Sequence, residues 1–549
     1  MPARGAQNSN AYPHTLVRGN VSKKRIFFAI LLCGSLLGLI AYILTTIGKK
    51  DATVLNGQCL NCNVVLISID SLRPKNMSLY GYNRITTPLI DKFSQSALVF
   101  ENYFASAYLT PISEGSVHTG LYPDSNGMIS FRNEFNPDVK TLAEMFKNNG
   151  YQTIAFGSSP EFESFESLKK SFSRGFDHYI FAKSRMENKR KPDWKKLRRV
   201  LKKQKHPLFL WFTIGVVHAP YGYQLENRFA DADYQGPFLG LQFLNNMQFY
   251  FDGLIYDFLT PGKDFRITDW AASDKTNHFY TKHLKKFKQF PIRTTAQDIQ
   301  YITDQYDNGV YQADVQVGRL LRMLAQNGLE RETVVVIQSE HGESLGEHGY
   351  IAHYDIWDET THVPLIISSP ALKNGRNSDL ISGVDVMPSL LHHVGVPASG
   401  FKYEFDGKNF LNTVNGLANP VRDEVFLTRT PLWESILKTG ETNSLFDRFR
   451  SLDDKIGFKD YAIRTKQEKL IHRQARLIEE EFSCWTFVSG KKIVRSEYEY
   501  YDLLADPAES TPRDSRKVEV LKEKLYQFEN EIKTRAKLTG KNPSIQDYQ

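Results

Sequence analysis

Cysteine is scarce in this 549-residue chain, and its placement excludes most cysteine-based sites. Cys59 and Cys62 form a C-x-x-C motif that has no second copy, so a structural zinc site built from two such motifs is not expected. In an oxidising compartment the pair favours a local or an intermolecular disulfide. The sequence also shows no internal repeat.

Acidic residues are absent before Asp51, whereas residues 1–25 contain five lysines and arginines. The uncharged stretch 26–47 that follows is long enough to cross the roughly 30 Å hydrocarbon layer of a membrane as a helix. The basic flank should stay in the cytoplasm, and the chain beyond residue 50 should be translocated. Since no small-x-small cleavage site follows, we expect an uncleaved signal anchor rather than a cleaved signal peptide.

Positive charge is concentrated in residues 183–205. This segment contains twelve lysines and arginines and only two acidic residues, Glu187 and Asp193. A solvated helix face is the simplest interpretation. Because Trp194, Leu197 and Leu201 would share one face of that helix, it could also rest on anionic lipid or steer an anionic substrate. No nucleic-acid-binding motif accompanies the segment, so nucleic acid is not an expected partner.

Strand-like and helix-like segments alternate along the central part of the chain, which predicts βαβ units around a largely parallel sheet and thus an α/β fold. The segments are Asn63–Asp70, Thr86–Ala97, Thr141–Asn149, Gln152–Phe156, Pro207–Thr213, Asp304–Gln326, Thr333–Ser339 and Pro364–Ser368. Residues 223–292 interrupt the alternation, as either a lid or a peripheral insertion would.

The pattern changes after about residue 400. Short strands are expected at Glu424–Thr428, Tyr461–Ile471 and Tyr498–Leu503, followed by a helix at Val518–Leu538. This combination predicts a small α+β subdomain with an antiparallel sheet.

Two of the buried strands end in residues of the kind that bind metal ions. Asp70 follows the first strand, and Glu340 and His341 follow Thr333–Ser339. The carboxyl ends of the strands in an open α/β sheet are where ligands bind, so these side chains should converge although they are far apart in the sequence. The sequence therefore predicts a metal site at this edge.

A hydroxyl residue precedes a proline in the segment Thr110-Pro111-Ile112-Ser113. Either Thr110 or Ser113 could act as a nucleophile at the N-terminus of a helix, where free N–H groups would bind an anion. Hydroxyl residues before Pro and Gly are also common in ordinary loops.

Together these segments resemble the sulfatase branch of the alkaline phosphatase superfamily. The matching motifs, in order, are Asp70-Ser71-Leu72-Arg73, Thr86-Thr87-Pro88, Thr119-Gly120-Leu121-Tyr122-Pro123, His218-Ala219-Pro220-Tyr221, Ser339-Glu340-His341-Gly342-Glu343 and Tyr501-Asp502-Leu503. The resemblance implies an alkaline-phosphatase-like sandwich that carries a metal-dependent hydrolase or transferase of sulfate or phosphate esters. The substrate would be an anionic ester of a lipid, a glycan or an envelope polymer.

The resemblance also implies roles for individual residues. Thr110 stands where sulfatases carry the residue converted to formylglycine, and a threonine cannot be converted in this way. The likeness therefore extends to relatives with a threonine nucleophile, such as phosphoethanolamine and glycerophosphate transferases and phosphodiesterases. In these enzymes a divalent metal ion activates the hydroxyl. Asp70, Glu340, His341 and Thr110 would hold that ion, which would be Zn, Mn, Mg or Ca.

Two further histidines fit the same pocket. His218 matches the substrate-side histidine of the family and would protonate a leaving oxygen or bind the transferred group. His353 is a second candidate for that role. Ser113 is the alternative to Thr110 as nucleophile.

Three departures from the family pattern support an alternative, a catalytically degenerate, membrane-tethered binding or assembly protein of the same fold. Glu340 stands in place of the usual Asp, and Ser71 in place of a second Asp. The segment Phe156–Pro160 lacks the basic residue of a Gly-Lys-Trp-like motif.

The expected organisation begins with a cytoplasmic tail (1–25), a transmembrane signal anchor (26–47) and a linker (48–62). A catalytic domain (63–400), including the insertion 223–292, and a C-terminal subdomain (401–549) follow. The protein would be a single-pass membrane protein whose catalytic domain lies in the periplasm or in the lumen of the secretory pathway.

Overall fold

The computed structural model forms two compact units, Met1–Lys50 and Asp51–Gln549. It describes residues 52–131, 133–159, 161–181, 192–204, 207–219, 221, 227–236, 295–349, 351–353, 355–398, 403–414, 420–430, 459–474, 496–514 and 518–538. Within these ranges no helix is both long and apolar enough to cross a membrane. The expected anchor, residues 26–47, lies outside them, and so does most of the insertion 223–292.

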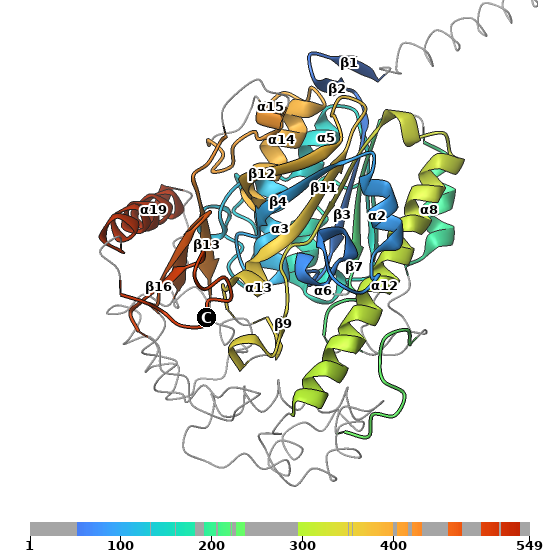
Figure 1. The fold of residues 1–549 in the computed structure, drawn as a ribbon. Helices are drawn as coiled ribbons and strands as arrows, with labels where there is room; N and C mark the ends of the chain where they lie inside the picture. The colour runs from blue at the N-terminus through green and yellow to red at the C-terminus, as the bar shows by residue number, and fades with distance from the viewer. Residues whose placement is uncertain are drawn as a thin grey trace, which may run out of the picture. The chain divides into compact units, whose positions relative to one another are not determined.

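An eight-stranded sheet forms the core, in the order β12-β4-β11-β8-β3-β7-β5-β6 (Figure 1). The bounds of its strands are β3 Asn63–Ile69, β4 Leu98–Phe104, β5 Gln152–Gly157, β6 His178–Phe181, β7 Leu208–Ile214, β8 Thr333–Gln338, β11 His362–Ser368 and β12 Gly375–Ser382. Every residue of β3, β7 and β8 is buried, as their unbroken apolar sequences predict for central parallel strands.

The sheet is mostly parallel, but β11 runs antiparallel to both of its neighbours, β4 and β8. The prediction that Pro364–Ser368 continues the βαβ alternation was therefore wrong. Between β8 and β11 the chain forms only the two-residue strands β9 (Ser344–Leu345) and β10 (Ile351–Ala352), a 3-10 turn and the one-turn helix α13 (Asp358–Thr361). A parallel return needs a long crossover connection, usually a helix that packs on the sheet, and α13 is the only α-helix described in this connection.

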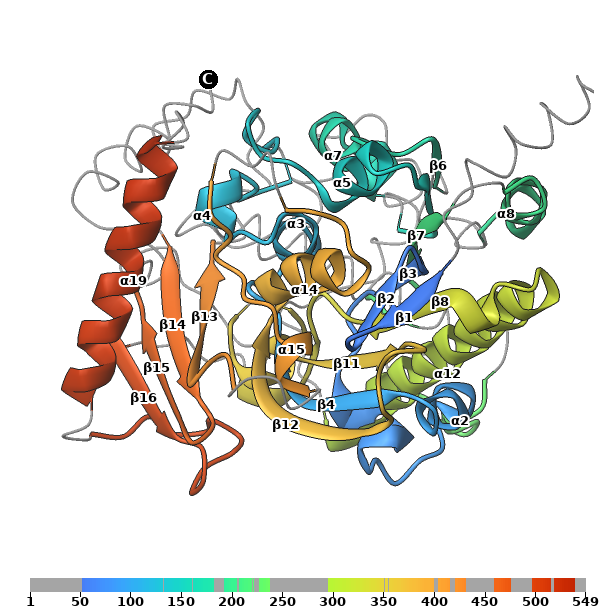
Figure 2. The same ribbon diagram turned by 90° about the horizontal axis from the view of Figure 1, so that it is seen from above.

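Helices cover both faces of the sheet (Figure 2). One hydrophobic core contains residues of α2 (Pro88–Ser94), α8 (Trp194–Leu201) and α12 (Ala296–Gln326). The opposite core contains residues of α5 (Leu142–Asn148), α7 (Glu166–Phe172) and α14 (Val386–His393). The helix predicted at Asp304–Gln326 begins earlier, at Ala296, because Thr295 and Asp298 form a capping box there.

Other helices in this part of the chain are shorter. They are α3 (Thr110–Thr119), α4 (Pro123–Asn126), α6 (Glu161–Ser164) and α15 (Leu411–Val414). A two-stranded hairpin, β1 (Thr53–Leu55) with β2 (Gln58–Leu60), precedes β3. Cys59 and Cys62 form a disulfide, which confirms the local alternative for this pair.

The C-terminal part forms a four-stranded antiparallel sheet of β13 (Glu424–Arg429), β14 (Asp460–Thr465), β15 (Glu468–His472) and β16 (Tyr498–Asp502). The helix α19 (Val518–Leu538) packs on this sheet. The single strand predicted at Tyr461–Ile471 was wrong, because the chain turns at Lys466 and Gln467 into a hairpin. Its two arms have the same alternating pattern, so the pattern alone does not show the turn.

Candidate active site

Strand register brings Asp70 and Glu340 to the same edge of the sheet. In the parallel pair β3 and β8, Ser68 lies opposite Gln338, and each acidic residue follows two positions later. Both side chains are buried, with 2% and 3% of their surface exposed. Metal-binding atoms of Asp70, Glu340 and His341 lie within 4.8 Å of one another. The convergence predicted from the strand ends is present.

Thr110 is the first residue of α3 and is buried beside this cluster. Its Oγ1 lies 3.0 Å from Nε2 of His341. The same Nε2 lies 3.4 Å from Oδ1 of Asp70. A hydroxyl, an imidazole and a carboxylate therefore meet at one point, although they come from three segments of the chain.

The hydrogen bonds of His341 define its tautomer. Its Nδ1 donates to the carbonyl oxygen of Gly342 at 2.9 Å, so Nε2 carries a lone pair directed toward Thr110 and Asp70. Burial and the neighbouring His353 lower the pKa of His341 well below its usual value. His341 is thus neutral near pH 7, which is the form that binds metal ions.

Glu340 is a buried acid whose environment disfavours its charge. Burial first, and then the carboxylates of Asp70 and Glu114, raise its pKa well above the usual value. Within the described residues its Oε2 has no hydrogen-bond partner. A buried carboxylate oxygen without a partner is costly, and a divalent cation would remove that cost. These residues therefore fit a metal ion, and the longer Glu340 still reaches the cluster.

The loop that presents these ligands is fixed by backbone pairing. The amide N of Gly342 donates to the carbonyl of Thr360 at 2.8 Å, and that of Glu343 donates to the carbonyl of Glu359 at 2.9 Å. A Cβ at position 342 would lie 2.2 Å from the carbonyl oxygen of Glu359, so only glycine allows this approach.

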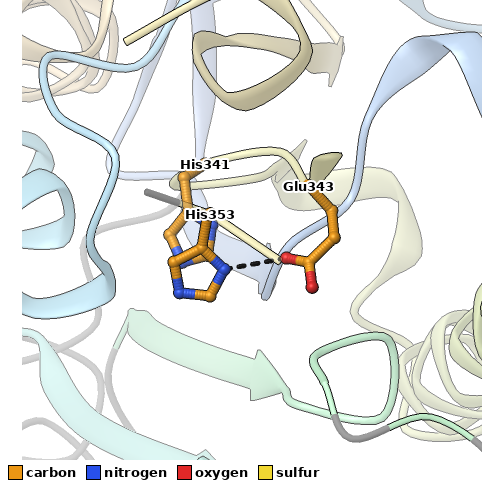
Figure 3. A group of neighbouring side chains, drawn as sticks. All are labelled: His341, Glu343 and His353. Atoms are coloured by element: carbon orange, nitrogen blue, oxygen red, sulfur yellow. Dashed lines mark hydrogen bonds and ion pairs between the residues drawn. The ribbon is translucent and has the colours of Figure 1, made fainter. Parts of the chain in front are cut away.

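Figure 3 shows a second group of side chains, His341, Glu343 and His353, whose metal-binding atoms also lie within 4.8 Å of one another. Nδ1 of His353 bonds to Oε2 of Glu343 at 2.8 Å, and the hydroxyl of Tyr221 donates to Oε1 of the same carboxylate. His341 already uses both of its ring nitrogens elsewhere. We therefore interpret Glu343 as the residue that orients His353, not as a ligand of a second cation.

The three predicted histidines gather in one place. The ring of His353 lies 4.1 Å from that of His341, between ring centroids, and 5.0 Å from that of His218. His218 follows β7, and its Nδ1 bonds to the carbonyl oxygen of Ala219. Both His218 and His353 thus lie close to His341.

Ser113 is buried one turn further along α3. Its hydroxyl has no hydrogen-bond partner among the described residues, whereas Thr110 contacts His341 directly. Of these two hydroxyls, that of Thr110 is the one in contact with His341.

Sequence reasoning missed the roles of Glu343, Tyr221 and Glu114. Glu114 accepts hydrogen bonds from Ser68 at 2.8 Å and from Gln338 at 3.2 Å, and so links α3 to the ends of β3 and β8. An acidic residue in a segment that is otherwise apolar or small was the available signal for Glu114. Glu343 lies two residues after His341 in the motif, which was a signal for a supporting role.

Comparisons with known proteins agree with this fold. A solved phosphonate monoester hydrolase of Agrobacterium radiobacter superposes with a TM-score of 0.59 at 18% identity, covering 86% of this chain and 96% of that one. The fold is therefore of the alkaline-phosphatase-like α/β class. The sulfatase family model matches residues 62–396, and the chain belongs to that family.

Two relatives with known names are similar over most of the chain. Human iduronate 2-sulfatase is 26% identical over 421 residues, which cover 64% of this chain and 73% of that protein. N-acetylglucosamine-6-O-sulfatase of Bacteroides thetaiotaomicron is 25% identical over 380 residues, covering 61% and 68%. The chain is a sulfatase-family hydrolase.

Proposed function

We propose that the protein cleaves or transfers the anionic group of a sulfate or phosphate ester, with Thr110 as its nucleophile. The observation that carries this proposal is the 3.0 Å contact between Oγ1 of Thr110 and Nε2 of His341, beside Asp70. Three buried polar groups at the end of a parallel sheet are costly unless they serve a site.

Asp70, Glu340, His341 and Thr110 would hold one divalent cation. Their donor set, oxygen-rich with one imidazole, suits Zn, Mn, Mg or Ca. When bound, the cation would lower the pKa of the Thr110 hydroxyl and polarise the ester.

The chain's own residues account for the remaining chemistry. Oγ1 of Thr110 would give its proton to solvent and attack sulfur or phosphorus, and the bond from that atom to the ester oxygen would break. Oγ1 would take a proton back from solvent when the group is removed from it. His218 or His353 would give the departing oxygen a proton. The same histidine would then take a proton from the water or acceptor hydroxyl that removes the group from Thr110.

The names of the relatives guide the choice of substrate. Two are sulfatases of sugar derivatives, and the similar solved structure is a phosphonate monoester hydrolase. We propose that the substrate is a sulfate or phosphate ester carried by a glycan, a lipid or an envelope polymer. Membrane anchoring through residues 26–47 and an extracytoplasmic site remain part of the proposal.

The catalytically degenerate alternative is less favoured, because Glu340 and Ser71 leave the cluster intact. Glu340 lies within the group of metal-binding atoms, and the hydroxyl of Ser71 donates to Oδ1 of Asp70 at 3.3 Å. The two residues that differ from the family pattern therefore still lie in or beside the cluster.

The proposal is tested by assaying the full-length protein on an aryl sulfate, an aryl phosphodiester and an aryl phosphonate with added divalent metal. Thr110→Ala should lower kcat at least about a thousandfold because the nucleophile is removed. Ser113→Ala is the matched control, one turn away on the same helix, and should keep its activity. An inactive Ser113→Ala beside an active Thr110→Ala would overturn the assignment. A wild-type protein that binds metal and turns over no ester would favour the degenerate alternative.

A further inference from the structure

The basic segment singled out in the sequence contains the helix α8, which lies beside α12 (Figure 1). Its apolar residues Trp194, Leu197 and Leu201 are buried in the same hydrophobic core as α12. The apolar face is therefore used inside the protein. An amphipathic helix that binds a bilayer by insertion needs that face free.

The outward face of α8 and the two residues after it consist almost entirely of cations. The exposed side chains are Lys195, Lys196, Arg198, Arg199, Lys202 and Lys203. In the described part of the chain, none of them forms an ion pair with an acidic residue. The one acidic neighbour on the helix, Asp193, caps its N-terminus by accepting from the amide N of Lys196 at 3.0 Å.

The helix α12 extends this charge. The guanidinium carbon of Arg319 lies 4.6 Å from the centre of the Trp194 ring. Burial, and then the like charges of Arg198 and Arg322, lower the pKa of Arg319. The cations of the two helices are thus close enough to repel one another. We call these eight residues, the six above with Arg319 and Arg322, the α8–α12 patch.

Cations that are close together and have no acidic partner repel one another, and this destabilises the fold. A ligand that neutralises them relieves that repulsion, which makes its binding more favourable. Arginine forks match the geometry of sulfate and carboxylate groups, and lysine adds unspecific attraction. The ligand that fits is a chain bearing many such groups at intervals, since one small anion would engage only a few of the eight cations.

The patch is also within reach of the proposed site. On α12, the hydroxyl of Tyr306 donates to the carbonyl of Ser71, next to Asp70, at 2.7 Å. Arg319 lies thirteen residues further along this continuous helix, a rise of about 20 Å. A flexible polymer of several sugar rings spans that length.

We infer that the α8–α12 patch binds a polyanionic glycan chain and holds it while one of its ester groups occupies the site at Thr110. This inference rests on the proposed function for its biological meaning, but binding to the patch does not require catalysis. An anionic membrane surface is the competing partner, and α8 exposes no large apolar side chain for it.

The test measures binding of the full-length protein to immobilised heparin, a sulfated polymer, with neutral dextran as the blank. Arg198→Glu/Arg199→Glu should weaken heparin binding at least about tenfold at about 0.05 M salt, and the difference should shrink at about 0.5 M salt because the charges are screened. Lys373→Glu/Lys466→Glu is the matched control. It reverses two exposed cations outside both helices, neither of which has an ion pair within the described ranges, and it should bind like the wild type.

Each outcome decides the question. Equal heparin binding by both double variants and the wild type overturns the inference. Charge-dependent binding to vesicles of phosphatidylcholine and phosphatidylserine, without binding to heparin, overturns it in favour of a membrane surface. Turnover of a small aryl ester should be unchanged in Arg198→Glu/Arg199→Glu. If heparin binds and no ester is turned over, the proposed function fails while the patch assignment stands.

Discussion

His341 organises the site because its two ring nitrogens face in different directions. Nδ1 is committed to the carbonyl of Gly342, and this leaves Nε2 for Thr110 and Asp70. The glycine is required by the close approach to Glu359, so the backbone of the loop sets the chemistry of the side chain.

Glu343 should matter to catalysis without binding the cation. In Glu343→Gln the amide cannot accept from both Tyr221 and His353, so the orientation of His353 is lost. We expect kcat to fall about tenfold to a hundredfold with KM little changed. Tyr221→Phe removes only one hydroxyl and should have a smaller effect. Steady-state kinetics, together with the metal content of each variant, checks this. Loss of one bound cation in Glu343→Gln would show that Glu343 is a ligand after all.

At this scale the sequence predicted the residues that lie at strand ends and missed those that support them. Asp70, Glu340 and His341 follow recognisable buried strands, and Thr110 begins a helix at a motif. Glu343 and Tyr221 meet only because separate loops fold over the sheet edge, and no periodicity in the sequence encodes such a contact.

Among the elements, α2 is held to α12 by a buried carboxylate. Asp314 of α12 accepts hydrogen bonds from the amide N of Leu89 at 3.0 Å and of Ile90 at 2.7 Å, in the first turn of α2. Burial nevertheless raises the pKa of Asp314 to about 7. The fold therefore binds the proton more tightly than the unfolded chain, and this group's contribution to stability falls as the pH rises from about 4 to 7.

Asp314→Asn should remove that pH dependence, since an amide oxygen still accepts the bonds and no charge is buried. The variant should gain stability relative to the wild type between pH 5 and pH 8. Urea unfolding at pH 5 and pH 8 gives the change in the free energy of unfolding for each protein, and the two changes are then compared. If the difference in the free energy of unfolding between variant and wild type is the same at both pH values, this account is contradicted.

The central strands were predictable from the sequence, and the orientations of the outer ones were not. β3, β7 and β8 are continuous apolar runs, which only a doubly covered sheet accommodates. The direction of β11 follows a connection whose only described α-helix is the one-turn α13, and the turn at Lys466 divides a segment whose pattern does not change. Strand β4 was missed because Leu98–Phe104 is only partly apolar.

On the scale of the whole molecule, buried ion pairs join the C-terminal sheet to the catalytic core. Nζ of Lys469 in β15 lies 2.9 Å from Asp358 of α13 and 2.8 Å from Glu509, and its side chain is completely buried. Arg473 similarly bonds to Asp355 at 2.6 Å. These contacts place the C-terminal sheet against the loop that follows Glu340 and His341.

Lys469→Met should destabilise the protein by about 3–5 kcal/mol, because Glu509 would lose its buried cation and Asp358 would keep only Arg464, 3.0 Å away. The neighbouring exposed Lys466→Met is the control and should change the free energy of unfolding by less than about 0.5 kcal/mol. Chemical denaturation of both variants gives the comparison. Equal stabilities would mean that the interface does not depend on this cation.

The central claim is that Asp70, Glu340 and His341 surround one cation next to Thr110. A crystal of the protein soaked in Mn²⁺ tests it most directly through the anomalous difference map. We predict one peak, about 2.0–2.3 Å from ligand atoms of all three residues and within reach of Oγ1 of Thr110. A peak bound instead by Glu343 and His353, or no peak at the strand ends, would contradict the account.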